Sequence, residues 1–318
     1  MYKSYEIYKF RDWINTTRLH KQLLNYNKKA HLLYDIRPEW INWETLTYNE
    51  NAIHILEKNV DKIYWPSLYQ NNKAFLILKN FPEKIDWFHI PYFPEAIPLI
   101  EQNLNKIGFD RLCFNPAAIH ILERNIHKIN WTYLSLNTKA IDLLSANQDK
   151  IDWTNLSLNE NAIPILEKNI NKIDWKTLSS NVNATHLFEL CPYPSLLNWP
   201  ALCENVNALP YIIKNFNYID WNTLNTNPKA FDFIMEHKYY IRWEFLSENP
   251  SAIDFLEQNK HRVCYCHLSY NQAIFELDYK KMSKKRTSIF EEELMMTALH
   301  PSKIESWLQN GFSVDDLF

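Results

Sequence analysis

The nearest approach to a metal site in this sequence is the run Cys264-Tyr265-Cys266-His267. Thiolate and imidazole are ligands that zinc prefers, but a structural zinc site takes four ligands, usually from two separated pairs. The three ligating residues lie almost side by side in the chain, and no CxxC or HxxxH pair elsewhere completes the set. We therefore predict that the protein binds no metal and no other cofactor.

Groups that could act as acids or bases recur at regular intervals. His54, His120 and His186 are equally spaced, and a glutamate recurs five residues before a lysine (Glu57, Glu101, Glu123, Glu167; Lys62, Lys84, Lys106, Lys128, Lys150, Lys172). A catalytic pair is unique in its chain, so repetition indicates surface roles. We interpret the histidines as solvated, and the other groups as solvated or as ion pairs worth roughly a few tenths of a kcal/mol.

The composition excludes several further activities. Only two glycines are present, Gly108 and Gly311, too few for a loop that holds phosphate through close backbone N–H groups. A net charge of −3 disfavours general nucleic-acid binding, which needs an excess of Lys and Arg. We predict that the protein is not an enzyme, has no small-molecule substrate and binds no nucleic acid.

Compartment signals are weak but consistent. The five cysteines have no disulfide-like spacing, and we interpret them as reduced thiols in a cytosolic compartment. The N-terminal segment is too polar for a signal peptide, and no apolar run is long enough for a membrane span. A basic run near the C-terminus is interpreted as a solvated linker, with a localisation signal or anion-binding patch as the alternative (Lys280, Lys281, Lys284, Lys285, Arg286).

The regular spacing of these groups comes from a 22-residue internal repeat. The segment NENAIHILEKNVDKIYW at 49–65 returns as NENAIPILEKNINKIDW at 159–175. We number each unit so that its tryptophan is position 3, and a two-residue insertion near Cys191 shifts the later units. The recurring indoles, expected to form the repeat core, are Trp43, Trp65, Trp87, Trp131, Trp153, Trp175, Trp199, Trp221 and Trp243.

Three other positions are nearly invariant from unit to unit. Position 6 is Leu or Ile, and position 12 is Ala from Ala52 to Ala252. Position 9 is asparagine at Asn49, Asn71, Asn115, Asn137, Asn159, Asn181, Asn205, Asn227, Asn249 and Asn271. A worn copy precedes them, with Leu24, Asn27 and Ala30 on the same three positions. A fixed period of this length indicates a solenoid or a similar stack.

Each unit is predicted to hold two short helices. Asp or Asn at position 2 suits the N-cap of the first helix, and Asn at position 9 suits the N-cap of the second. Positions 12, 13 and 16 form the expected inward stripe of the second helix, with position 15 on its flank. Asn at position 19 suits a left-handed C-terminal cap.

Two points stay open at this stage. Pro98, Pro164 and Pro210 fall at position 14, so the second helix of those units either begins later or is locally tight. A leucine-rich repeat shares this period, but its strand needs a leucine near position 4, where Glu44, Pro66 and other non-leucine residues stand.

One unit alone buries too little apolar surface to offset the entropy of ordering its chain, so it requires neighbours on both sides. We predict an all-α fold, an α-solenoid of about eleven two-helix repeats with helical caps at both ends. The expected parts are an N-terminal cap with the degenerate repeat (1–40), the array (41–279) and a C-terminal helical cap (280–318). In the last part, Pro301 and Gly311 bracket a helix expected to help cover the final repeat.

Position 8 offers the best candidate surface for a partner. In the N-terminal half it points away from the Trp–Leu face and carries large side chains, of which we select Tyr48, Tyr92, Phe114, Leu136 and Leu158. A continuous row of exposed apolar side chains marks an interface. The alternative is that position 8 packs against the neighbouring unit.

Units of the form I-D-W-x-x-L-S-x-N-x-x-A-I-x-x-L-E-x-N-x-x-K resemble a 22-residue repeat family of large DNA viruses, notably the giant viruses of amoebae. Members often end with a truncated unit, an acidic helix and an HP helix, here Leu268 to Phe275, Asp278-Tyr279 and EEELMMTALHPSKI. The chain departs from this pattern at Phe109, at Phe93 and at the insertion near Cys191, where the stack is expected to bend.

The resemblance implies a viral origin and carries no activity with it. On these grounds the expected function is a non-enzymatic scaffold that binds a viral or host protein along the solenoid surface. Its expected place is the host cytoplasm, including the viral factory, with no contact to membrane. The alternative is a structural component of the virion.

Overall fold

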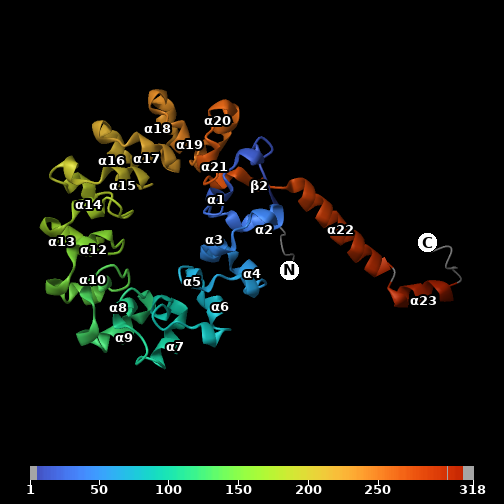
Figure 1. Cartoon of the computed structure of the whole chain (residues 1–318), viewed down its shortest axis with the longest axis horizontal. Coiled ribbons are helices and arrows are strands. Elements are labelled where there is room, and N and C mark those ends of the chain that lie inside the picture. Colours follow the sequence, from blue (N-terminus) through green and yellow to red (C-terminus); the bar gives the residue numbers. More distant parts are fainter. Residues whose placement is uncertain (1–5, 299, 311–318) are drawn as a thin grey trace. The chain divides into compact units, whose positions relative to one another are not determined.

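The computed structural model describes residues 6–298 and 300–310 and separates two compact units. We call the larger one, Asn15–Ile274, the array, and the smaller one, which combines the residues before Asn15 with those after Ile274, the terminal unit. These boundaries differ from the sequence-based divisions at residues 40 and 279. The array is a solenoid of short helices, which confirms the predicted all-α class (Figure 1).

The first helix of a unit begins at the aromatic residue of position 3. Its position 2 side chain caps it: Asn42 accepts from the Thr45 N–H at 3.1 Å, and Asp152 from the Asn155 N–H at 3.0 Å, as predicted. These helices are α3 (Trp43–Tyr48), α5 (Trp65–Leu68), α8 (Phe109–Leu112), α10 (Trp131–Leu134), α12 (Trp153–Leu158), α14 (Trp175–Leu178), α15 (Trp199–Glu204), α17 (Trp221–Thr226), α19 (Trp243–Leu246) and α21 (Tyr265–Leu268).

The second helix begins at position 13, so a proline at position 14 occupies its first turn. No interior N–H is lost there, and this settles the question raised by Pro98, Pro164 and Pro210. The second helices are α4 (Ile53–Leu56), α6 (Phe75–Leu78), α7 (Ile97–Glu101), α9 (Ile119–Glu123), α11 (Ile141–Ser145), α13 (Ile163–Lys168), α16 (Leu209–Lys214), α18 (Phe231–Glu236) and α20 (Ile253–Gln258).

Short 3-10 turns join these helices. Those within units include Glu50–Ala52, Pro94–Ala96, Pro116–Ala118, Pro228–Ala230, Pro250–Ala252 and Gln272–Ile274. Those ending units include Val60–Lys62, Pro82–Lys84, Ile126–Lys128, Gln148–Lys150, Ile170–Lys172, Phe216–Tyr218, Lys238–Tyr240 and Lys260–Arg262. In two irregular units a 3-10 turn replaces a helix, at Ile90–Tyr92 and at Leu187–Leu190.

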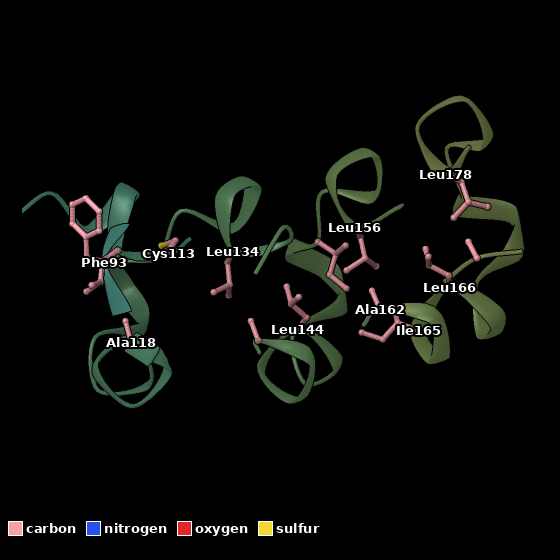
Figure 2. Packing of buried hydrophobic residues seen from close by; sticks show 14 of the residues in the cluster. Phe93, Cys113, Ala118, Leu134, Leu144, Leu156, Ala162, Ile165, Leu166 and Leu178 are labelled. Atoms are coloured by element: carbon pink, nitrogen blue, oxygen red, sulfur yellow. The ribbon is translucent and has the colours of Figure 1, made fainter. Parts of the chain in front are cut away.

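The core lies between the two rows of helices (Figure 2). Leu134 of position 6, Leu144 of position 16 and Ala162 of position 12 are fully buried. Position 15 is also buried, as at Ile165, whereas position 13 is mostly half-buried, as at Ile163. The inward-facing positions are therefore 12, 15 and 16. Position 15 takes the inward place that was predicted for position 13.

The predicted left-handed cap at position 19 is wrong. Asn59 and Asn169 have φ values of −133° and −134°, outside the left-handed region. The side chain caps the helix in another way, because Asn59 Nδ2 donates to the Ile55 carbonyl at 2.9 Å and satisfies an orphan acceptor of the helix end. Asparagine is selected here for its amide donor.

Asparagine at position 9 holds neighbouring units together. Asn137 Oδ1 accepts from the Lys139 N–H at 3.0 Å and so caps the following turn. Its Nδ2 reaches the preceding unit and donates to the carbonyls of Cys113 and Asn115 at 2.8 and 3.0 Å. Asn137 is buried, so these bonds satisfy backbone groups that water cannot reach. Phe93 interrupts this ladder, but its own carbonyl still accepts from Asn115.

Position 7 makes a second joint that the sequence analysis did not foresee. Ser135 Oγ donates to the Trp131 carbonyl at 2.8 Å and accepts from the Asp152 N–H of the next unit at 3.1 Å. The equivalent N–H of the following unit is accepted by the side chains of Thr47, Tyr69, Ser157, Ser179, Asn225 and Ser247. A hydroxyl or amide at this position therefore links consecutive units.

The same bonds join the last unit of the array to the first. Asn27 Nδ2 donates to the carbonyls of Ser269 and Asn271, both at 3.0 Å, and the His20 N–H donates to Ser269 Oγ at 2.9 Å. Helix α1 (Lys21–Leu24) lies beside α21 as a consequence (Figure 1). The unit that begins at Leu19 thus follows the last repeat as the next repeat would, and the array closes on itself.

The rest of this first unit consists of Ala30–Leu32, α2 (Leu33–Ile36) and Pro38–Trp40, after the turn Thr16–Arg18. The first unit is linked to the second through Asn25 at position 7, whose Oδ1 accepts from the Asn42 N–H at 2.8 Å. The C-terminal helices were expected to cover the final repeat, but residues of the first unit occupy that face.

The terminal unit contains a small antiparallel sheet that was not predicted. Strand β1 (Tyr8–Phe10) pairs with β2 (Phe275–Leu277), with Phe10 opposite Phe275 and their rings 5.0 Å apart. Helices α22 (Tyr279–Ala298) and α23 (Pro301–Gln309) follow. Pro301 begins α23 as predicted, and Gly311 lies outside the described residues. Within the described residues, no helix is both long enough and apolar enough to cross a membrane.

Candidate functional site

The position 8 side chains lie at the end of the first helix of each unit, and the structure gives them mixed burial. Tyr48, Tyr92 and Leu158 are each 37% exposed, whereas Phe114 and Leu136 are half-buried. Position 8 therefore packs against its neighbours, as the alternative interpretation expected, and still presents apolar surface. We call this row of side chains the stripe.

Two side chains of the stripe, Tyr92 and Phe114, belong to an aromatic cluster that spans three consecutive units. The Phe114 ring lies 5.6 Å from that of Tyr92 and 4.8 Å from that of Tyr133, measured between centroids. Arg111 ties the cluster together, because its Nη1 donates to Tyr92 Oη at 2.9 Å and its guanidinium carbon lies 3.3 Å above the Phe88 ring. Phe88 is 57% exposed, so the cluster offers both aromatic faces and a cation to a partner.

Closure of the array extends the stripe. Tyr26 is the position 8 residue of the first unit, so Tyr270, Tyr26 and Tyr48 occupy this position in three consecutive units. Tyr26 and Tyr48 line a cavity of about 430 Å³ whose polar walls include Lys28, Glu50 and Gln70. A tyrosine offers apolar area and a hydroxyl at low entropic cost, which suits a contact surface.

The remaining position 8 residues are polar: Gln70, which stands between Tyr48 and Tyr92 in repeat order, and the consecutive set Ser180, Glu204, Thr226 and Glu248. The Glu248 carboxylate is bonded to the His267 ring, with 2.6 Å between Oε1 and Nδ1. The array therefore has an apolar arc and a polar arc at the same position of the repeat.

The position 3 rings are covered by position 22 side chains. The Lys62, Lys150 and Lys172 ammonium groups lie 4.5–4.8 Å from the Trp43, Trp131 and Trp153 centroids. In later units tyrosine takes this place, and the Tyr240 ring stacks on Trp221 at 4.1 Å. Arginine takes it at Arg262 over Trp243. The first unit reverses the roles, with Lys21 at position 3 and Trp40 at position 22, 5.1 Å apart.

This pairing revises two interpretations. The lysines contact rings, a role that the prediction of solvated groups or ion pairs missed. The indoles are half-buried (Trp43, Trp65, Trp87, Trp131, Trp153, Trp175, Trp221, Trp243), and of this set of nine only Trp199 is buried. The recurring signal was a cation or tyrosine nineteen residues after every repeat tryptophan except Trp175, where Pro194 stands.

The repeated histidines also have specific partners. His120 Nε2 is 2.9 Å from Glu101 Oε1, and His186 Nε2 is 2.8 Å from Glu167 Oε1, each bond crossing between units. His54 makes an edge contact with His31 at 6.4 Å between centroids. These side chains are partly exposed and link neighbouring second helices, which is more than the solvated role predicted for them.

The thiols show no sign of activation. Burial raises the pKa of Cys113 and of Cys203 to about 11, so both stay protonated at neutral pH. Both occupy position 7, where the Cys113 sulfur accepts from the Asn130 N–H. In the Cys264–His267 run, the Cys264 N–H is bonded to Ser247 and His267 to Glu248. Across the described residues, no three His, Cys, Asp or Glu side chains come together as a metal site.

The basic run lies on α22 and is helical, and its side chains are solvated as expected. Asp278 Oδ1 accepts from the Lys281 N–H at 2.9 Å and begins the helix. The side chains of the run are exposed (Lys280, Lys281, Lys284, Lys285, Arg286). Further along α22, Leu294, Met295 and Met296 are 59–76% exposed.

Comparison with family models, with curated proteins and with solved structures returned no match.

Proposed function

We propose that the protein is a non-enzymatic scaffold that binds another protein along the stripe. The observation that carries the proposal is the aromatic cluster of Phe88, Tyr92, Phe114 and Tyr133 with Arg111 bonded among them. Aromatic and arginine side chains dominate the energetics of protein interfaces. We further propose that the protein acts in an infected cell, and this part of the proposal is supported by the resemblance of the repeat to the viral repeat family.

Three features favour binding over catalysis. The polar side chains of the array recur from unit to unit and are engaged in joining units, as Asn137 and Ser135 illustrate. The buried thiols have raised pKa values, which makes them poor nucleophiles. A closed array presents a fixed surface, which reduces the entropy lost when a partner binds.

The test compares the two arcs of the same repeat position. The stripe variant carries Tyr92→Ser, Phe114→Ser and Leu136→Ser, and its matched control carries Glu204→Ser, Thr226→Ser and Glu248→Ser. We carry out affinity capture from cells that produce the protein. We expect the wild type and the control to recover the same specific partners and the stripe variant to lose them. Circular dichroism and thermal unfolding establish that both variants are folded.

A photo-crosslinking residue at Tyr92 sharpens the test, because it labels proteins that contact the stripe directly. The same residue at Glu204 serves as its control. Recovery of every partner by the stripe variant, or equal crosslinking from both sites, would contradict the proposal.

A further inference from the structure

Trp175 is an exception to the pairing of position 3 rings with position 22 side chains. The unit that begins at Ile173 contains the two-residue insertion, and Cys191, Pro192, Tyr193 and Pro194 run through the segment that would supply a lysine. Within residues 6–298 and 300–310, no cationic or aromatic side chain lies over the Trp175 ring. The indole is half-buried and keeps part of its surface open.

A groove of about 600 Å³ lies over this indole. It is lined by Ile170 and Asn171 from the end of the preceding unit, and by Leu190 and Pro192 from the irregular segment. Leu190 is 49% exposed and Ile170 is 39% exposed, so the apolar walls are accessible. All of these residues belong to the array, and none belongs to the stripe.

The rest of the array indicates what fits this groove. In six of the regular units the indole face is occupied by an ammonium or guanidinium group at 4.5–5.4 Å from the centroid, and over Trp199 and Trp221 a tyrosine ring stacks there instead. The attraction comes from the ring quadrupole and applies equally to a cation supplied by another molecule. Ile170, Leu190 and Pro192 give the groove apolar wall surface, which suits the methylene stem of a long basic side chain.

The charges at the rim are balanced. Glu167 lines the groove, and one of its carboxylate oxygens is 2.8 Å from the His186 ring. Lys168 lines it as well. The Glu167 carboxylate offsets the charge of Lys168, so an entering cation meets little net repulsion. The preference of the groove for a cation therefore comes from the Trp175 indole.

We propose that the groove over Trp175 is a binding site for a lysine side chain of a partner protein, which takes the place that position 22 fills in the regular units. The site lies apart from the stripe and is independent of the proposed function. A basic segment of a partner, with an apolar residue on each side of the lysine, matches the ring and the walls made by Leu190 and Ile170.

The experiment uses a defined probe and the full chain. The probe is a capped peptide with a single lysine between two leucines, and its matched partner carries acetyllysine at the same place. Indole Nε1–H resonances are followed by NMR during titration, and the Trp175 signal is assigned as the one lost in Trp175→Phe. We expect a saturable shift of the Trp175 signal with the lysine peptide and about 2- to 30-fold weaker binding of the acetylated one.

A second variant keeps the test decisive should substitution of Trp175 disturb the fold. Leu190 is exposed, so Leu190→Lys leaves the core intact and places a lysine of the chain itself beside the indole. We expect this variant to bind the peptide more weakly than the wild type. Trp153, already covered by Lys172, is the internal control. Equal shifts with both peptides, an equal response of Trp153, or unchanged binding in Leu190→Lys would each overturn the proposal.

Discussion

An interior joint of the array and the joint that closes it are made with the same bonds. Asn137 donates to two carbonyls of the unit before it in sequence, at 2.8 and 3.0 Å. Asn27 makes the equivalent pair at 3.0 Å, but its acceptors, Ser269 and Asn271, lie more than two hundred residues later. The same side-chain hydrogen bonds therefore join two units whether or not the units are consecutive in the chain.

The difference is covalent. At an interior joint the peptide chain keeps the two units together after their bonds break, whereas the closing joint has no such tether within the array. Local opening follows the regions with the weakest support, so the closing joint is where the array is expected to open first. This also explains why no separate cap is required: each terminal face of the array covers the other.

The largest effect is expected from removal of matched core leucines. Leu24 in the closing unit and Leu134 in the interior are both fully buried. Either Leu24→Ala or Leu134→Ala should remove about 2–5 kcal/mol of local packing free energy. We expect Leu134→Ala to lower the free energy of unfolding of the whole array, and Leu24→Ala to accelerate exchange chiefly in residues 19–40. Urea unfolding and amide hydrogen exchange measure the two. Identical exchange patterns in both variants would show that the joints are equivalent.

The next effect concerns the position 9 amides. Asn27 and Asn137 are each 2% exposed, so Asn27→Ala and Asn137→Ala leave buried carbonyls without donors, at about 1–3 kcal/mol in each case. Asn51 also donates to a carbonyl, that of Lys28, but it is exposed. Asn51→Ala is the control and should change stability by less than about 0.5 kcal/mol. A similar loss in all three variants, measured by urea unfolding, would contradict the role of the ladder.

The smallest effect depends on pH. It distinguishes an interior joint with a cysteine at position 7, Cys113, from the closing joint, which has a serine there. Burial raises the pKa of Cys113 from 9.0 to about 11, so between these values the folded state keeps a proton that the unfolded state releases. The free energy of unfolding should therefore fall as the pH rises through this window, and Cys113 should have no such effect below pH 9. At the closing joint Ser269 has this position and does not titrate there.

Cys113→Ser is the variant that checks this effect. Serine at position 7 already accepts the next unit's N–H at Ser135, so the fold should tolerate it. We expect the variant to lose less stability than the wild type between pH 9 and 11, in parallel urea titrations. An unchanged pH profile would rule out a contribution from this thiol.

The sequence predicted the repeat unit well, since its signals are local. Asp152 as an N-cap and Asn137 as a cap of the following turn follow from side-chain reach alone. The candidate site was predicted only in part. Tyr92 and Phe114 share a repeated position, but Phe88, Arg111 and Tyr133 stand at positions whose residue type varies, so periodicity could not select them. Tyr26 belongs to the stripe because its unit completes the array.

By itself, the sequence determined the 22-residue unit, its two short helices and its need for neighbours, because capping and periodic burial act over a few residues. Only the tertiary structure decided that the last unit meets the first, that a basic or tyrosine side chain covers each regular indole, and that Trp175 is left open. Closure depends on small rotations summed over every unit, and no single unit encodes that sum.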